Sequence, residues 1–378
     1  MILRIFNPSH DECLASGSPY YTPSRTAQAM DAVRLPGWHC LVDSLPPWDE
    51  VERIEPWGWD ARLVQQLRRR GCPDRLLPSA ERLATIRRLS SRQTAVKLLP
   101  MVTERFESWW VGATSPHSLD HSLSPSGLAT PPCHPSPVRE GKNTLQEMLS
   151  ALEGVSSPSL TGEGWQSSEG SFDGERLEVV GGCHSSLLFK SPWSCSGRGV
   201  FTYDEKRIRK VMREQGGIEV EPLYPRVADF AMEFRCEGGE VTFLGLSAML
   251  NGGTSARGAA YGGNLVASDE TIMGLMTRYV PETEITEARD RLLDVLRREI
   301  APFYDGPLGV DQMIVGPPYA LHPLVELNLR HTMGLVAIEM RTTQISAAHE
   351  RAVVPLLWDF FTLFPVLCKV SAIHVLQN

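Results

Sequence analysis

The sequence lacks the short motifs that assign several common enzyme classes directly. It contains no C-x-x-C pair, no H-E-x-x-H run, no G-x-x-x-x-G-K-[ST] loop and no G-x-G-x-x-G turn. The first two absences argue against a zinc ribbon and a zincin protease. The last two argue against a P-loop NTPase and a dinucleotide fold of the Rossmann type. A nucleotide site in this chain would therefore have to use another arrangement.

The charge balance and the apolar runs exclude further classes. The chain has 37 Lys and Arg against 45 Asp and Glu, a net charge of -8, whereas a general nucleic-acid binder usually carries a basic surplus. The most apolar stretch, residues 353–367, contains Pro355, Asp359 and Pro365. It is shorter than the ~20 residues of a membrane-spanning helix, so we expect a buried C-terminal helix there.

Targeting and redox signals are also scarce. The first apolar run ends at Asn7-Pro8, which is too short for a signal peptide. The eight cysteines are scattered along the chain, and this favours reduced thiols over a disulfide framework. We expect a cytoplasmic protein that binds neither nucleic acid nor a membrane.

The length and the local composition divide the chain into three parts. With 378 residues and roughly 100–200 residues per domain, two or three domains are expected. We predict an α/β (α+β) protein with a small parallel α/β domain at 1–111 and a compact region at 177–378. Between them, 112–176 is rich in Ser, Pro and Gly, a composition typical of a disordered insertion. Helical apolar spacing predicts one short helix inside it, at 144–153.

Hydrophobic periodicity predicts the main elements on either side of this insertion. In the N-terminal part we expect strands at 3–6 and 39–42, helices at 26–33 and 59–70, and a pair of helices within 80–99. In the compact region we expect a helix at 287–300 and strands at 187–190, 220–224, 228–235, 241–248, 309–315 and 324–329.

The first candidate site follows the strand at 187–190, which ends in Lys190. A loop of small residues comes next, with Ser194, Ser196, Gly197, Arg198 and Gly199. Small residues allow backbone N–H groups to approach a polyphosphate, and a lysine adds a point charge. The alternative is a tight hairpin turn with an exposed lysine. Cys195 lies in the same loop, but without a paired histidine it is expected to be only a small residue.

The second candidate site is the run Glu326-Leu327-Asn328-Leu329-Arg330. Alternation places the three polar side chains on one face of a strand, and hard oxygen ligands suit Mg²⁺ bridging phosphates. Asp311 lies in the apolar run just upstream, and neighbouring antiparallel strands would bring it close to Glu326 and Asn328. The alternatives are an exposed face on which Glu and Arg pair, and a cap or turn role for Asp311.

Taken together, these features resemble the ATP-grasp superfamily, and more narrowly a group of uncharacterised bacterial ATP-grasp proteins that share the runs at 6–11 and 190–194. The resemblance covers roughly residues 177–340 and implies a two-subdomain ATP-grasp core after an N-terminal domain. It implies ATP and Mg²⁺ as cofactors. The run 218–223, which contains Glu221, is similar to the hinge strand that receives the adenosine in this family. The resemblance also implies roles for individual residues: Lys190 and the loop from Ser194 to Gly199 on the phosphates, Glu221 near the ribose or adenine, Asp311, Glu326 and Asn328 on Mg²⁺, and Arg330 beside the transferred phosphate.

The activity that this resemblance implies is ATP-dependent ligation of a carboxylate to an amine or thiol through an acyl phosphate. The carboxylate would belong to a small molecule or a peptide. Two alternatives stay open, a nucleotide-binding module without catalysis and a kinase-like phosphotransferase. An earlier nucleotide-binding lysine is often present in the family, and Lys97 is the nearby candidate, although its helical setting favours a surface role.

Two further features have no assigned role. Asn7, His10 and Asp11 follow the first strand, at the carboxyl end where parallel sheets commonly bind ligands, although an Asx-type turn is an equal alternative. The Gly-rich segment 251–264 suggests either a substrate loop or, more simply, a hairpin connection.

Overall fold

The computed structural model describes residues 1–112, 187–194, 197, 199–255 and 258–347. Most of the predicted insertion, the helix at 144–153, the C-terminal helix at 353–367 and the loop residues Ser196 and Arg198 lie outside these ranges. None of the helices within them is long and apolar enough to cross a membrane.

The N-terminal unit contains a small parallel sheet, as the sequence predicted. Its strands run in the order β2-β1-β3 and are parallel. They are β1 (Ile2–Phe6), β2 (His39–Cys40) and β3 (Arg53–Pro56). The helices of this unit are α1 (His10–Ser16), α2 (Arg25–Asp31) and α3 (Ala61–Arg69). Leu3, Ile5, Leu63 and Leu67 form its buried core because they occupy the inward positions of β1 and α3.

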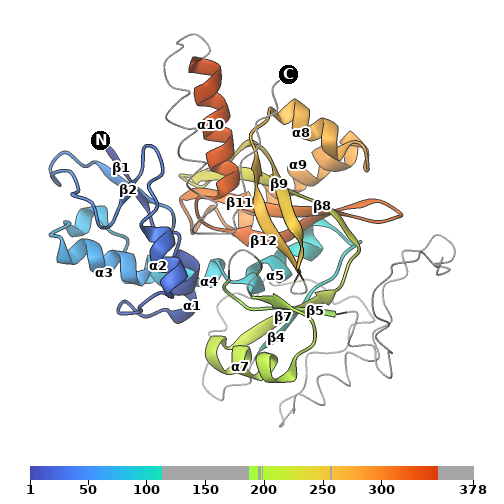
Figure 1. The fold of residues 1–378 in the computed structure, drawn as a ribbon, viewed down its shortest axis with the longest axis horizontal. Helices are drawn as coiled ribbons and strands as arrows, with labels where there is room; N and C mark the ends of the chain where they lie inside the picture. Colours follow the sequence, from blue (N-terminus) through green and yellow to red (C-terminus); the bar gives the residue numbers. More distant parts are fainter. Residues whose placement is uncertain (113–186, 195–196, 198, 256–257, 348–378) are drawn as a thin grey trace.

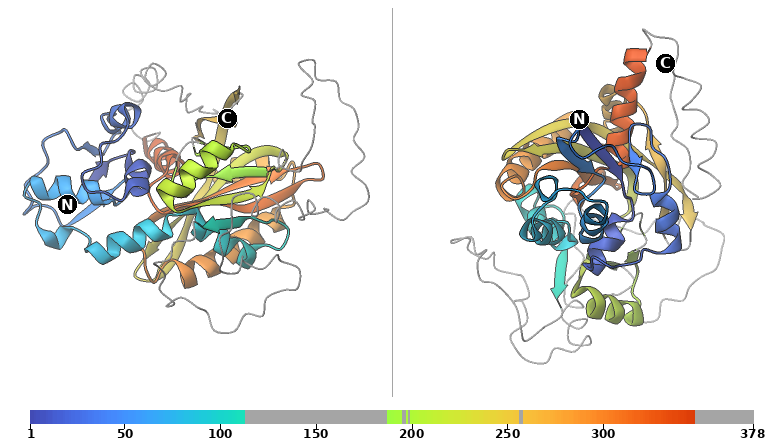
Figure 2. Two further views of the ribbon diagram at one scale, coloured as in Figure 1. Left: turned by 90° about the horizontal axis from the view of Figure 1, so that it is seen from below. Right: turned by 90° about the vertical axis from the view of Figure 1, so that its left-hand side faces the viewer.

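A short 3-10 helix and two helices connect this unit to the rest of the molecule (Figures 1 and 2). They are η1 (Asp74–Leu76), α4 (Ala80–Leu89) and α5 (Arg92–Val102). The side chains of Ser79 and Ser91 each accept a hydrogen bond from the first turn of the helix that follows, and this fixes where α4 and α5 begin.

The largest sheet has five antiparallel strands in the order β10-β9-β8-β11-β12. The strands are β8 (Arg226–Glu237), β9 (Glu240–Ser255), β10 (Gly258–Leu265), β11 (Gly306–Val315) and β12 (Ala320–Asn328). Its helices are α8 (Asp269–Met276), α9 (Glu282–Glu299) and α10 (Met333–Ala347). The β9 and β10 strands form a hairpin over most of 251–264, which agrees with the simpler interpretation of this Gly-rich segment.

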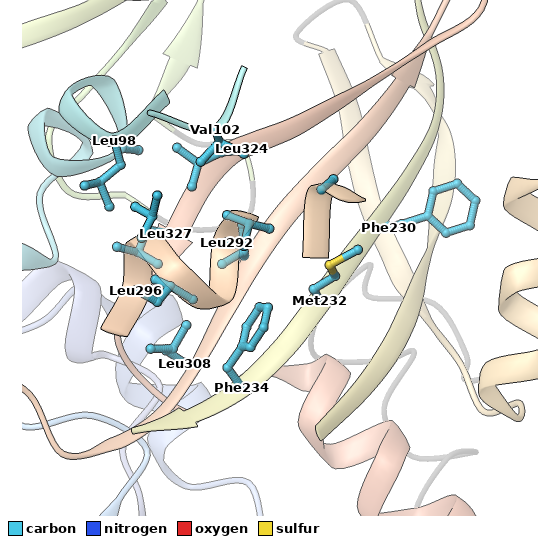
Figure 3. Packing of buried hydrophobic residues seen from close by; sticks show 14 of the residues in the cluster. Leu98, Val102, Phe230, Met232, Phe234, Leu292, Leu296, Leu308, Leu324 and Leu327 are labelled. Atoms are coloured by element: carbon cyan, nitrogen blue, oxygen red, sulfur yellow. The ribbon is translucent and has the colours of Figure 1, made fainter. Parts of the chain in front are cut away.

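The main hydrophobic core lies between one face of this sheet and the helices α5 and α9. Phe230, Met232 and Phe234 alternate along β8 and meet Leu98 of α5 and Leu292 of α9 in this core. Figure 3 shows these side chains together with others of the cluster. The intervening positions of β8 face the other side of the sheet, where α10 begins, so the alternation separates an apolar face from a polar one.

A second antiparallel sheet has four strands in the order β4-β7-β5-β6. The strands are β4 (Trp109–Gly112), β5 (Leu187–Lys190), β6 (Val200–Phe201) and β7 (Gly217–Pro222). The helix α7 (Glu205–Gln215) covers one face, where Ile208 and Val211 pack on Phe189, Ile218 and Val220. In Figure 1 this sheet and α7 lie below the five-stranded sheet.

The N-terminal unit packs against the core through contacts near α10. The backbone N–H of His331 donates to the carbonyl of Trp57 at 2.7 Å, and Trp38 contacts the His331 ring. Arg235 of β8 pairs with Glu55 of β3 at 2.7 Å. These contacts place the ends of β1 and β3 beside the residues that follow β12.

Candidate active site

The polar face of the five-stranded sheet contains the predicted metal-binding residues. In the antiparallel register, Asp311 of β11 lies directly opposite Glu326 of β12, and Gly309 lies opposite Asn328. Asn328 also donates a side-chain hydrogen bond to Asp311. Asp311 is therefore a strand residue rather than a cap. Directly opposed residues have Cβ atoms about 4.5–5.5 Å apart, so the two carboxylates are neighbours.

The electrostatics of this face favour a bound cation. Burial, together with the nearby charges of Glu326 and Glu233, raises the pKa of Asp311 to about 8. Adjacent carboxylates disfavour each other's charged form unless a cation compensates them. In the described part of the chain no group of three or more His, Cys, Asp or Glu is arranged to hold a metal alone. Two carboxylates with an amide oxygen suit Mg²⁺, which usually shares phosphate oxygens.

Glu233 of β8 is a third carboxylate on this face, which the sequence analysis missed. It accepts hydrogen bonds from the hydroxyls of Thr332 at 2.9 Å and Ser247 at 3.1 Å. Burial raises its pKa to about 7, although these hydrogen bonds act in the opposite direction. A Cβ atom at Gly334 would lie 2.0 Å from the Glu233 carboxylate, so the close approach requires glycine there. The alternation of apolar and polar positions along β8 was the sequence signal that indicated the face on which Glu233 lies.

Lys190 is buried at the end of β5, which contradicts the alternative of an exposed lysine. Its ammonium group lies 2.7 Å from Glu221 and 3.5 Å from Glu219, both on β7. Burial lowers the pKa of Lys190, but the two glutamates outweigh burial and raise it overall. Two acids share one lysine, and burial raises the pKa of Glu219 to about 7. Lys190 is thus the cation that pairs with Glu221.

Arg92, at the first position of α5, connects the two sheets. Its guanidinium donates to Glu326 at 2.7 Å, to the carbonyl of Ser191 at 2.6 Å and to the hydroxyl of Ser194 at 2.6 Å. It is almost fully buried, and Glu219 lies 4.0 Å from its Nε atom. A cation in the first turn of a helix opposes the helix dipole. This unfavourable placement was the signal, within the Arg-rich segment 80–99, that Arg92 has partners elsewhere.

The loop after Lys190 forms a hairpin between β5 and β6. The backbone N–H of Ser191 donates to the carbonyl of Gly199, and that of Val200 donates to the carbonyl of Gly197. A Cβ atom at Gly199 would lie 2.2 Å from the Ser194 hydroxyl, so the chain needs a glycine for this approach.

Arg330 lies beyond the end of β12, partly buried. Its Nε atom donates to Asp11 of α1 at 3.2 Å. A narrow cavity here is lined by Asp11, Glu326, Asn328, Arg330, Ser194 and His10, among others. The structure thus brings most of the predicted site together. Lys97 is exposed on α5 and does not join it.

Two features lie apart from this cluster. A larger cavity, of about 360 Å³, lies between α2 and α3 and is lined by Asp31, Arg62, Arg69 and Arg70, among others. His322 of β12 is buried against Phe106 and Tyr224. Burial, followed by the charge of Lys190, lowers the pKa of His322 to about 3. The sequence analysis singled out neither feature.

Comparison with solved structures gives similarities at low sequence identity. N5-carboxyaminoimidazole synthetase from Staphylococcus aureus, complexed with ADP, is 12% identical with a TM-score of 0.44, over 89% of this chain and 73% of that one. Pyruvate carboxylase from Rhizobium etli is 14% identical with a TM-score of 0.45, over 90% of this chain and 27% of that one. Biotin carboxylase from Campylobacter jejuni is 12% identical with a TM-score of 0.31, over 50% of this chain and 38% of that one.

At these identities and TM-scores, the similarity is to the arrangement of elements and carries no function over. No protein-family model matches the chain, and no curated protein matches it.

Proposed function

We propose that the chain is an ATP-dependent ligase that joins a carboxylic acid to an amine or thiol through an acyl phosphate. The observation that carries the proposal is that one site combines a pair of carboxylates with a buried arginine and the loop that follows Lys190. Asp311 and Glu326 are direct partners on the large sheet, and Arg92 links Glu326 to the loop that follows Lys190. This arrangement can hold a polyphosphate and the cation that neutralises it.

Each residue has a chemical role in this proposal. Lys190 and the loop from Ser194 to Gly199 hold the phosphates of ATP. Within this loop, Ser196 and Arg198 are assigned on the sequence alone. Glu221 lies near the ribose or adenine. Asp311, Glu326 and Asn328 would hold Mg²⁺, which would supply charge neutralisation for phosphoryl transfer. Arg330 stabilises the negative charge that develops beside it. Phosphoryl transfer needs little more from a protein than such positioning and charge neutralisation.

The reaction balances in two steps. A carboxylate oxygen of the acid attacks the γ-phosphorus of ATP, the bond to the β-phosphate oxygen breaks, and ADP leaves. The amine nitrogen then attacks the acyl carbon, the C–O bond to the phosphate breaks, and an amide and inorganic phosphate result.

The described cysteines Cys13, Cys40, Cys72 and Cys236 are buried and free, which supports the proposed reducing, cytoplasmic setting.

The experiment uses hydroxylamine as a general trap for acyl phosphates. The full chain is incubated with MgATP, hydroxylamine and a pooled set of acids, namely the twenty amino acids, succinate and bicarbonate. ADP is measured together with hydroxamate. We expect both products in the wild-type chain. Because Glu326 would be one of the residues that hold Mg²⁺, Glu326→Gln should reduce both products by about 100-fold or more, which is a loss of about 2.7 kcal/mol of transition-state stabilisation.

Glu240→Gln is the matched control, because Glu240 is an exposed glutamate at the start of β9. It should leave both products unchanged. ADP with a stable phosphorylated product and no hydroxamate would favour the kinase-like alternative. ATP binding without turnover would favour the silent nucleotide-binding module. No ATP binding at all would contradict the proposal.

A further inference from the structure

The run after β1, which the proposed function leaves without a role, forms a second polar cluster. His10 is the first residue of α1, and its side chain is buried. It lies at the carboxyl ends of β1 and β3. In the strand order β2-β1-β3, the chain adds β2 on one side of β1 and then β3 on the other side. Ligands of open parallel sheets commonly bind at such a switch point.

The contacts of His10 indicate which nitrogen carries the proton in its neutral imidazole ring. Its Nδ1 atom lies 3.4 Å from the carboxylate of Asp60, which can only accept a hydrogen bond when ionised. In the neutral imidazole ring this contact places the proton on Nδ1, and the lone pair is then on Nε2. The Nε2 atom is buried and has no hydrogen-bond partner in the described part of the chain.

Asp60 is itself held in place on three sides. Its other oxygen accepts from the backbone N–H of Leu63 at 2.8 Å, as the N-cap of α3. Asn7 donates to Asp60 at 3.1 Å and to the carbonyl of Gly58 at 2.9 Å, and so joins the loops that follow β1 and β3. A Cβ atom at Gly58 would lie 2.5 Å from Nε2 of His10, so only glycine leaves room for the ring.

His10 forms part of the wall of the cavity that Asp11, Glu326, Asn328 and Arg330 also line. The cavity has a volume of about 10 Å³, which is close to the room that one water molecule needs. A head group of that size, such as an ammonium or amino group, fits this space. His10, whose Nε2 atom is buried and has no hydrogen-bond partner among the described residues, is thus one of the residues that line the cavity shared by Glu326, Asn328 and Arg330.

We propose that His10 is the general base for the acceptor, that the acceptor is an amine, and that Asp60 is a positioning residue that holds the imidazole. This inference rests on the proposed ligase function. The amine binds in the cavity as an ammonium group, and its proton passes to Nε2 of His10. The free amine then attacks the acyl phosphate, its second proton leaves with the phosphate as hydrogen phosphate, and His10 returns its proton to solvent.

The test separates acyl-phosphate formation from transfer to an amine that needs deprotonation. Ammonium is protonated at neutral pH and needs a base, whereas hydroxylamine is already neutral and does not. The full chain, MgATP and the same pooled acids are combined either with hydroxylamine or with ammonium chloride. Hydroxamate and primary amide are then measured by mass. Each protein is also checked for its melting temperature.

In His10→Gln we expect hydroxamate within about threefold of the wild-type rate and primary amide reduced by about 100-fold, at the lower end of the range for general bases. Asp60→Asn keeps the helix cap, because Asn is an equally good N-cap. This variant should also form hydroxamate near the wild-type rate and less primary amide, with a smaller loss of amide than His10→Gln, because the ring loses its orienting partner. His39→Gln is the control, because His39 lies on the neighbouring strand β2 away from this cavity, and it should leave both rates unchanged.

The outcomes distinguish the two proposals. Absence of hydroxamate in the wild-type chain would remove the proposed function and this inference with it. Hydroxamate without primary amide in the wild-type chain would overturn the amine assignment alone. Equal losses of both products in a folded His10→Gln chain, or no loss of amide, would overturn the role of His10. If His10→Gln does not fold, the split or its absence in Asp60→Asn decides the question.

Discussion

Arg92 is expected to contribute more to stability than any exposed arginine of the chain, because it joins α5, the loop after β5 and β12. Its guanidinium is almost fully buried and pairs with Glu326 at 2.7 Å. It also donates to Ser191 and Ser194 at 2.6 Å each. In Arg92→Ala these acceptors lose their donor, and the carboxyl groups of Glu326 and Glu219 lose this neighbouring cation.

The magnitude follows from the cost of breaking a buried ion pair. Removing one partner of such a pair costs about 3–5 kcal/mol, because the remaining charge stays uncompensated. We therefore expect the free energy of unfolding of Arg92→Ala to fall by about 4 kcal/mol. Arg92→Lys keeps the charge but loses the planar fork that reaches several acceptors at once, so its loss should be smaller.

Chemical denaturation of the full chain measures this difference. Arg297→Ala is the matched control, because Arg297 is 44% exposed and pairs with Asp294 and Glu240 at the surface. Such a change should stay within about 0.5 kcal/mol. A loss below about 1 kcal/mol in Arg92→Ala, or an equal loss in the control, would refute the reasoning that Arg92 compensates buried charge.

Three further predictions concern the same site. Lys190→Ala should weaken MgATP binding by about 1.5–3 kcal/mol, the range for hydrogen bonds to charged groups; unchanged affinity by calorimetry would contradict the phosphate role. Gly199→Ala places a Cβ atom 2.2 Å from the Ser194 hydroxyl, so the loop must move and the same titration should show weaker binding. The pKa of Glu233 rises from 4.5 to about 7, so the native state keeps this proton longer than the unfolded state. Its contribution is fully present below about pH 4.5, and about 3 kcal/mol of stability is lost as the pH rises to about 7. Glu233→Gln should remove that part of the slope, and an unchanged slope in denaturation experiments would show that the proton is elsewhere.

The sequence predicted those parts of the fold and site that follow from local alternation. Period-two patterns located β8, β11 and β12 and assigned Glu326 and Asn328 to one face, because neighbouring residues of a strand point to opposite sides. Glu219 and Glu221 of β7 both pair with Lys190, although only Glu221 was singled out. Strand ends differed by a few residues, since turn geometry and pairing partners decide where a ladder stops.

The long-range contacts could not be predicted in this way. Arg92 and Glu326 are 234 positions apart, and no local pattern relates a helix start to a distant strand. Asp60 is the N-cap of α3, and its second oxygen faces His10 only because β1 and β3 are neighbours in the sheet. Such groups become visible only when the topology brings them together.

The most direct test of the central claim is a crystal structure of the full chain with Mn²⁺ and a non-hydrolysable ATP analogue. Mn²⁺ replaces Mg²⁺ at oxygen sites and gives an anomalous signal. We predict an anomalous peak about 2.0–2.2 Å from carboxylate oxygens of Asp311 and Glu326, with the phosphates beside Lys190 and the loop that ends at Gly199. A nucleotide bound instead in the cavity lined by Arg62, Arg69 and Arg70, or no metal between Asp311 and Glu326, would contradict the account.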